Sequence, residues 1–196
     1  RRVEPRPAAT SAPLSYASPR ACAPSMQLDA FHARWLGNDG GERANKDPFL
    51  NDLCDLLGVP RPDPATGDPE KDVYVYEKPA VLLHAAGKPT IGKIDLYRHG
   101  RFLLEAKQGS NETRTGRTRR GTNAWHAMMS DALGQAKRYV ETLDAPPPFL
   151  LVVDIGHCVD LFASFDGSRV YHPFPNALSN RTFFGDLEAL LPTLRA

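Results

Sequence analysis

Three ionisable residues near the middle of the chain, Asp95, Glu105 and Lys107, have the spacing D-x9-E-x-K. Two carboxylates can bind a divalent cation, and the backbone carbonyl of Ala106 could add a third oxygen ligand for Mg²⁺. A cation can activate water for attack on phosphorus, and an ammonium group can stabilise or orient the reacting groups. If the three side chains meet, we expect hydrolysis of a phosphodiester.

The surrounding residues predict a β-hairpin that would bring these side chains together. The apolar runs Thr90–Tyr97 and Arg101–Lys107 are joined by a short Arg-His-Gly turn. Side chains alternate between the two faces of a strand, so Glu105 shares a face with Lys107. A turn at this place sets Asp95 roughly opposite Glu105. The E-x-K spacing is common in proteins and usually marks an exposed strand end. Here the hairpin and its apolar surroundings favour a catalytic interpretation instead.

A second pair lies on the longest predicted helix, Asn123–Leu143, which the prolines at 146–148 would stop. Gln135 and Tyr139 are four residues apart and therefore on one helix face. The amide and the phenol would point together at whatever the helix packs against. The alternative is that Tyr139 is a core residue and Gln135 a surface residue.

The remaining pattern predicts helices before and after a set of strands. A helix over residues 28–36 precedes a second one that ends at Leu57, before Gly58. The second helix begins either with Asp47 as N-cap and Pro48 at the first position, or near Gly41 with a kink at Pro48. Further strands are expected at 73–77 with 80–84, 149–155, 159–165 and 169–172, and a final helix at 180–191. This order predicts an α/β sandwich with a central mixed sheet flanked by helices.

Composition limits the class of protein. The chain has 196 residues, which is enough for one sizeable core. Its net charge of +1 is too small for a general attraction to nucleic acid. Three cysteines without CxxC spacing argue against a disulfide framework or a zinc site, and a reducing cytoplasm fits. No apolar run is long enough to span a bilayer, so we expect no membrane partner.

The first 25 residues differ from the rest. They are rich in proline and alanine and hold four arginines and one glutamate, so without them the net charge falls from +1 to −2. Such a segment cannot bury enough apolar surface to order itself. We predict a disordered tail over 1–25, or sequence upstream of a true start at Met26, and a single domain over 26–196.

A polar stretch after Lys107 carries four arginines, Arg114, Arg117, Arg119 and Arg120. It shows no periodicity, so we expect a long exposed loop. Arginines neutralise phosphates in a way that depends on salt and not on sequence. These four are the predicted DNA-binding residues, in a loop that could order only on DNA.

Taken together, the D-x9-E-x-K pattern and the helix with QxxxY resemble the PD-(D/E)xK nuclease superfamily. More closely, the chain resembles the N-terminal endonuclease region of single-chain type IIG/IIL restriction–modification enzymes, which also carry an adenine-specific DNA methyltransferase and a target-recognition domain. The resemblance covers roughly residues 41–195. The matching stretches are ERAN at 42–45, FLNDLCDLLGV at 49–59, IDLY at 94–97, FLLEAKQ at 102–108, GQA at 134–136 and PFLLVVD at 148–154.

The resemblance implies a restriction-endonuclease-like three-layer α/β sandwich and a Mg²⁺-dependent endonuclease acting on double-stranded DNA. Asp95 and Glu105 would bind the metal, and Lys107 would be catalytic. Glu42 on the first long helix, or alternatively Glu77, would complete the metal site. Gln135 and Tyr139 would support the site or the DNA backbone. Cutting both strands needs two sites, which implies a transient homodimer.

The chain also departs from these enzymes, because it contains no NPPY or DPPY motif and no S-adenosylmethionine loop. We therefore expect a fragment or a remnant whose methyltransferase and recognition parts lie elsewhere, in a parent chain classed as a DNA methyltransferase or in a separate subunit. S-adenosylmethionine would belong to that missing part. The alternative function is an inactive nuclease fold that binds DNA or docks on a partner in a phage-defence complex.

Overall fold

The computed structural model of the chain describes residues 26–83 and 87–188. The tail predicted at 1–25 lies outside these described residues. Within them, the helices are α1 (Leu28–Trp35), α2 (Glu42–Leu57), α3 (Asn123–Val140) and a 3-10 helix (Phe184–Asp186). The strands are β1 (Tyr74–Leu82), β2 (Thr90–Arg98), β3 (Phe102–Lys107), β4 (Phe149–Asp154), β5 (Cys158–Ala163), β6 (His172–Pro173) and β7 (Arg181–Phe183).

The described strands form one mixed sheet in the order β1-β2-β3-β4-β5-β6, with β7 also paired to β5. Among them, β3 and β4 are parallel and the other pairs are antiparallel. A parallel pair needs a crossover connection, which α3 provides because it lies between β3 and β4 in the chain. In this pair Lys107 is opposite Asp154, so the end of the D-x9-E-x-K motif lies beside the end of β4.

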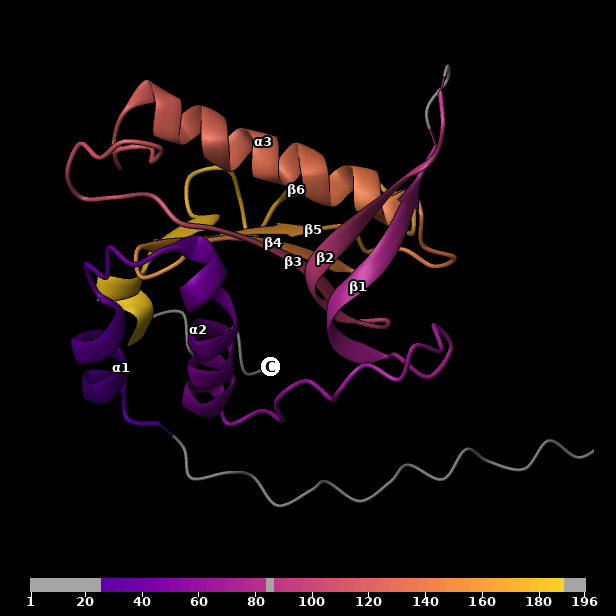
Figure 1. Cartoon of the computed structure of the whole chain (residues 1–196), viewed down its shortest axis with the longest axis horizontal. Helices are drawn as coiled ribbons and strands as arrows, with labels where there is room; N and C mark the ends of the chain where they lie inside the picture. Colours follow the sequence, from indigo (N-terminus) through magenta and orange to yellow (C-terminus); the bar gives the residue numbers. More distant parts are fainter. Residues whose placement is uncertain (1–25, 84–86, 189–196) are drawn as a thin grey trace, which may run out of the picture.

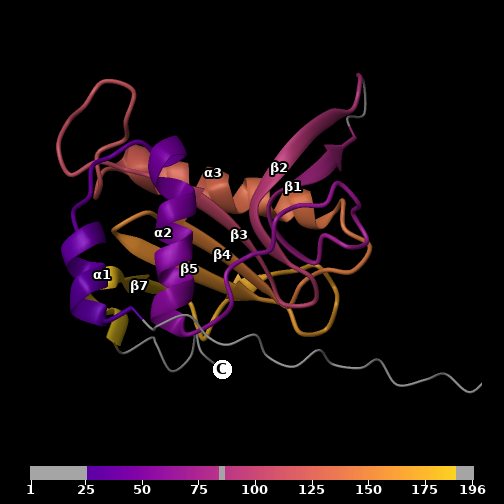
Figure 2. The ribbon, with the colours of Figure 1, turned by 60° about the horizontal axis from the view of Figure 1, so that its bottom comes forward.

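Helices cover both faces of the sheet, α1 and α2 on one side and α3 on the other (Figures 1 and 2). Successive side chains of β3 pack on opposite faces of the sheet, because strand side chains alternate. Each face therefore has its own hydrophobic core. Leu104 packs with Phe31 and Phe49 on the side of α1 and α2. Leu103 packs with Ala136 on the side of α3. The predicted restriction-endonuclease-like α/β sandwich is thus confirmed.

The ends of the long helices follow local signals. The Thr122 hydroxyl accepts a hydrogen bond from the Trp125 amide at 3.3 Å and caps α3. Gly58 ends α2 in the left-handed conformation, with φ 69°. α2 begins at Glu42, directly after Gly41, and contains Pro48. The alternative start near Gly41 is therefore confirmed, and the prediction of Asp47 as N-cap is wrong.

Two other predictions need correction. β1 is one strand where the sequence suggested two segments, since Pro79 lies in a strand at the end of the sheet order, where a missing N–H is tolerated. The helix predicted from residue 180 is wrong over 181–183, which form β7, whereas Phe184–Asp186 form a 3-10 helix. Arg181–Phe183 pairs with β5, and the Arg181 guanidinium binds both oxygens of Asp160 at 2.6 and 2.5 Å. Residues 189–191 of that predicted helix lie outside the described residues.

In the ranges that the structure covers, none of the helices combines the length and the apolar character needed to cross a membrane.

Candidate active site

The hairpin of β2 and β3 brings the two predicted metal ligands together. Its register pairs Leu96 with Leu104, so the next position along sets Asp95 against Glu105. Oδ2 of Asp95 accepts a hydrogen bond from the amide of Ala106 at 2.8 Å. This bond fixes the Asp95 carboxylate across the strand pair. The structure thus has the geometry that the spacing predicted for these two residues.

Glu105 is the most deeply buried acid of the cluster, only 1% exposed. Its Oε1 accepts a hydrogen bond from Nζ of Lys107 at 2.7 Å. Its Oε2 is buried and has no hydrogen-bond partner among the described residues. Burial, followed by the charge of Asp95, raises the pKa of Glu105 to about 7, although Lys107 lowers it. A buried acceptor without a donor is rare in folded proteins and calls for an explanation.

Glu42 joins the cluster from the first turn of α2. Burial raises the pKa of its carboxyl, the charge of Lys107 lowers that pKa and the charge of Asp95 raises it. Glu42 in turn contributes to the raised pKa of Glu105. Of the two alternatives named from the sequence, Glu42 is therefore the one whose charge acts on Glu105 and Lys107.

Glu77 reaches the cluster through a lysine that the sequence analysis missed. β1 pairs with β2 so that Glu77 stands at the level of Asp95. Lys46, one turn after Glu42 on α2, lies between them: its Nζ donates to Oδ1 of Asp95 at 2.8 Å and also to Oε1 of Glu77. The signal that could have found Lys46 is its spacing of four residues from Glu42, which puts both on one helix face.

Gln135 and Tyr139 interact as their spacing predicted, with Nε2 of Gln135 donating to the Tyr139 hydroxyl at 3.0 Å. Tyr139 is buried in the core beneath α3, close to Gly92 of β2. The hydrogen bonds of the described residues do not connect this pair to Asp95, Glu105 or Lys107. A role of the pair in catalysis stays a prediction.

The arginine-bearing loop divides into two parts. Arg114 and Arg119 are exposed, and Arg117 is partly buried with Nη1 donating to the backbone oxygen of Asp39. Arg114 lies 3.5 Å from the Asp39 carboxylate. Figure 2 shows this loop beside the connection between α1 and α2. The contacts of Arg114 and Arg117 with Asp39 thus hold the loop near the start of α2, where Glu42 lies.

Arg120 is the exception, and the expectation that it is exposed is wrong. Its guanidinium is buried and donates to both oxygens of Asp154 at 3.0 Å and to the backbone oxygen of Ile155 at 2.8 Å. Asp154 is itself fully buried and also accepts from the Trp125 indole at 2.7 Å and from the Gly109 amide at 2.9 Å. A buried ion pair with these partners anchors the loop, and it uses the guanidinium donors of Arg120 inside the protein.

The donor set suits a hard divalent cation, which prefers carboxylate and carbonyl oxygens. The observation that supports such a fit is the buried Oε2 of Glu105, which has no donor among the described residues. In the described ranges, no group of three or more histidine, cysteine, aspartate or glutamate side chains is arranged to hold a metal. Asp95 and Glu105 would therefore be the main protein ligands, with water or substrate oxygens completing the shell.

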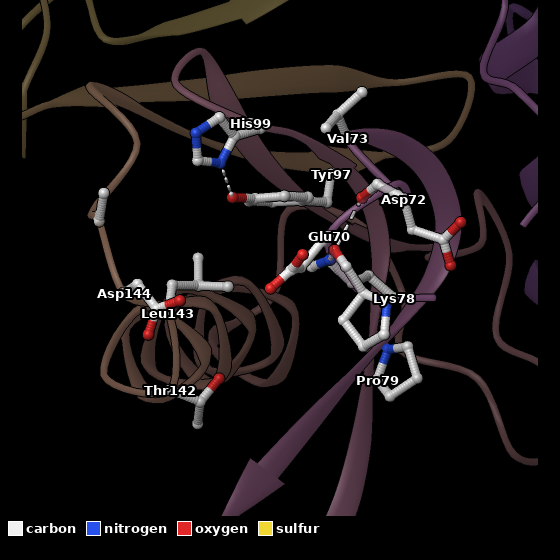
Figure 3. Close-up of a pocket in the computed structure, with 12 residues that line it drawn as sticks. Glu70, Asp72, Val73, Lys78, Pro79, Tyr97, His99, Thr142, Leu143 and Asp144 are labelled. Carbon is white, nitrogen blue, oxygen red and sulfur yellow. Dashed lines mark hydrogen bonds between the residues drawn. The ribbon is translucent and has the colours of Figure 1, made fainter. Parts of the chain in front are cut away.

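A pocket of about 380 Å³ lies elsewhere, between the hairpin and the end of α3 (Figure 3). In it, the Tyr97 hydroxyl and Nδ1 of His99 are 3.2 Å apart, and Nζ of Lys78 lies over the Tyr97 ring. None of the site residues predicted from the sequence lines this pocket. Nζ of Lys78 also donates to the backbone oxygens of Pro69 and Asp72. We place the candidate site at the carboxylate cluster instead, because the predicted metal ligands gather there.

The fold and this cluster define a restriction-endonuclease-like α/β domain with acids and ammonium groups gathered at one end of a hairpin. The family described as "MmeI, N-terminal domain" matches residues 26–190, which is most of the chain. The chain belongs to this family, the N-terminal region of type IIG restriction–modification enzymes, and the predicted resemblance to that region of single-chain enzymes is confirmed. Comparisons with curated proteins and with solved structures gave no match.

Proposed function

We propose that this chain hydrolyses phosphodiester bonds of double-stranded DNA, using Mg²⁺ held by Asp95 and Glu105, as a PD-(D/E)xK-type nuclease. The observation that carries the proposal is Oε2 of Glu105, which is buried, has no donor among the described residues and belongs to a carboxyl whose pKa is raised to about 7. A cation at this oxygen would supply the missing positive charge. When bound, Mg²⁺ would act as a Lewis acid on the phosphate.

Lys107 is assigned the role of charge stabilisation. Burial lowers the pKa of its ammonium group. The charge and hydrogen bond of Glu105 and the charges of Glu42 and Asp95 raise this pKa by more, so the net direction is upwards. Lys107 therefore stays protonated at neutral pH. A protonated lysine cannot accept a proton from water, so it would donate hydrogen bonds to a phosphate oxygen whose negative charge grows in the transition state.

Arg114 and Arg119 are assigned to the DNA backbone, because their side chains are exposed on the loop that follows Lys107. Contacts of this kind add salt-dependent affinity without sequence information. Arg117 could join them after leaving the Asp39 carbonyl. Specific recognition would come from another domain or subunit, together with the adenine-specific methyltransferase expected for this class of enzyme.

The test is cleavage of supercoiled plasmid by the chain with Mg²⁺, with EDTA, and by the Lys107→Ala variant. The matched control is Lys137→Ala, which removes an exposed lysine from α3. Cleavage should require Mg²⁺, fall by about a hundredfold or more in Lys107→Ala and persist in Lys137→Ala. Equal nicking by both variants would remove Lys107 from the mechanism.

A second candidate is an inactive nuclease fold that only binds DNA or a partner. The ion pair of Lys46 with Asp95 favours it, because an ammonium group already holds one proposed metal ligand. Isothermal titration with Mn²⁺ separates the two functions. A nuclease should bind Mn²⁺ in a way that Asp95→Asn abolishes, whereas an inactive module should show no such site.

A further inference from the structure

Lys46 stands at the position where the proposed function needs a metal. Its Nζ lies 2.8 Å from Oδ1 of Asp95, and it also donates to Oε1 of Glu77. The other Asp95 oxygen accepts from the Ala106 amide. Each oxygen of Asp95 therefore already has a donor. The Lys46 and Asp95 side chains are only 14% and 12% exposed, so this contact is shielded from solvent.

Glu77 offers Lys46 an alternative partner. Its side chain is 37% exposed, more than that of Asp95. Its Oε2 also forms a salt bridge with Nζ of Lys93 at 3.3 Å. Its backbone has φ 53° in the middle of β1, a conformation that residues other than glycine rarely adopt within a strand. Such an outlier persists where surrounding contacts hold it and often marks a functional segment. Here the contacts are the two lysines that bind its carboxylate.

Two cations cannot share Asp95 equally well. A divalent ion at Oδ1 would repel the Lys46 ammonium strongly at this short range, since the side chains of Lys46 and Asp95 are largely shielded from solvent. Lys46 would then have to give up Asp95. It need not enter bulk water, because its second hydrogen bond already runs to Glu77.

We propose that Lys46 is the resident counter-ion of the site. It neutralises Asp95 until a divalent cation displaces it, and Glu77 then retains the displaced ammonium. This inference rests on the proposed function, because it takes Asp95 as a cation ligand. It gives Glu77 the role of a positioning residue that acts through Lys46, in place of the direct metal ligand named as an alternative from the sequence.

The experiment measures Mn²⁺ affinity by isothermal titration calorimetry on the whole chain, without DNA. Lys46→Met should bind Mn²⁺ roughly ten- to a hundredfold more tightly, because a charged hydrogen bond to Asp95 no longer competes. Lys93→Met is the matched control. It removes an equal charge that contacts Glu77 but not Asp95 and has a side chain 63% exposed, so its effect should stay below about threefold.

A double-mutant cycle tests the role of Glu77. Glu77→Gln should weaken Mn²⁺ binding in the wild-type background, because Lys46 loses its second partner and holds Asp95 more firmly. In the Lys46→Met background the same change should have little effect. Equal weakening in both backgrounds would show that Glu77 is a direct ligand and would overturn its assigned role.

Lys46→Met leaves several acids close together, so Lys46→Arg provides a second variant that keeps the charge. Its Mn²⁺ affinity should remain within about threefold of wild type. If Lys46→Met binds Mn²⁺ no more tightly than wild type, the inference is overturned. The proposed function would survive that result if the wild-type chain still bound Mn²⁺ through Asp95 and cut plasmid. If no variant bound Mn²⁺ through Asp95 and none cut, both would fail.

Discussion

Replacing Glu105 by glutamine tests whether the candidate site is built at the expense of stability. In the folded chain this carboxyl keeps its proton up to a pKa of about 7, whereas its ordinary pKa is 4.5. Between these values the folded state binds more protons than the unfolded state. The free energy of unfolding of the wild-type chain should therefore fall as pH rises through this window.

The size of the effect follows from the same two values. A carboxyl whose pKa rises from 4.5 to about 7 on folding contributes about 3 kcal/mol of destabilisation once it is fully ionised. Glutamine does not titrate, so the variant lacks this loss. The stability of Glu105→Gln relative to wild type should increase by about 3 kcal/mol between pH 4.5 and pH 8. Taking the difference between the two proteins cancels most contributions of the other titrating groups.

The assay is urea unfolding followed by tryptophan fluorescence at several pH values, with EDTA present and constant salt. Glu141→Gln, at an exposed position, is the control and should show no such trend. Addition of Mg²⁺ at pH 8 should stabilise the wild type more than Glu105→Gln. A difference between variant and wild type that stays flat from pH 4.5 to 8 would refute the argument, because Glu105 would then ionise without penalty.

Two further predictions concern packing near the site. Gly92→Ala should lower the free energy of unfolding by about 1–3 kcal/mol in urea titrations, since a Cβ there would lie 2.5 Å from the Tyr139 ring. Gly185→Ala, where a Cβ would have nothing within 4 Å, should change the free energy of unfolding by less than about 0.5 kcal/mol. Equal losses in the two variants would contradict the packing argument. Asp154→Ala should cost about 3–5 kcal/mol in the same assay, because it leaves a buried guanidinium unpaired, whereas Asp131→Ala at an exposed position should be nearly neutral. A small effect at Asp154 would show that the anchor contributes little to stability.

The parts of the site that could be predicted from sequence are those set by local pattern. The alternation along β2 and β3 and the short turn between them fix the relation of Asp95 to Glu105. The contacts that the sequence did not predict join distant residues. Lys46 is 49 residues from Asp95, and Arg120 is 34 residues from Asp154. Nothing in the residues next to Lys46 or Arg120 indicates a carboxylate partner so far along the chain.

The error at the C-terminal end has a related cause. The residues from 180 onwards have a helical apolar pattern, but pairing with β5 provides backbone hydrogen bonds and a bidentate contact to Asp160. Strand formation depends on the neighbouring strand more than on the intrinsic preference of the segment. Such an outcome is decided by the tertiary structure and cannot be read from a single window of sequence.

The anchoring of the arginine-bearing loop has a consequence for how the domain could diversify. The Ser110 amide donates to Thr118 and the Arg120 amide donates to Ser110, at 3.0 and 2.9 Å, so the loop is closed at its base. Asp154 clamps the same base to β4. Insertions or deletions between residues 111 and 117 would be absorbed above this closure and would leave the spacing of the carboxylates unchanged. Under the proposed function, relatives could thus vary their contacts with DNA in small steps while the carboxylate cluster stays unchanged.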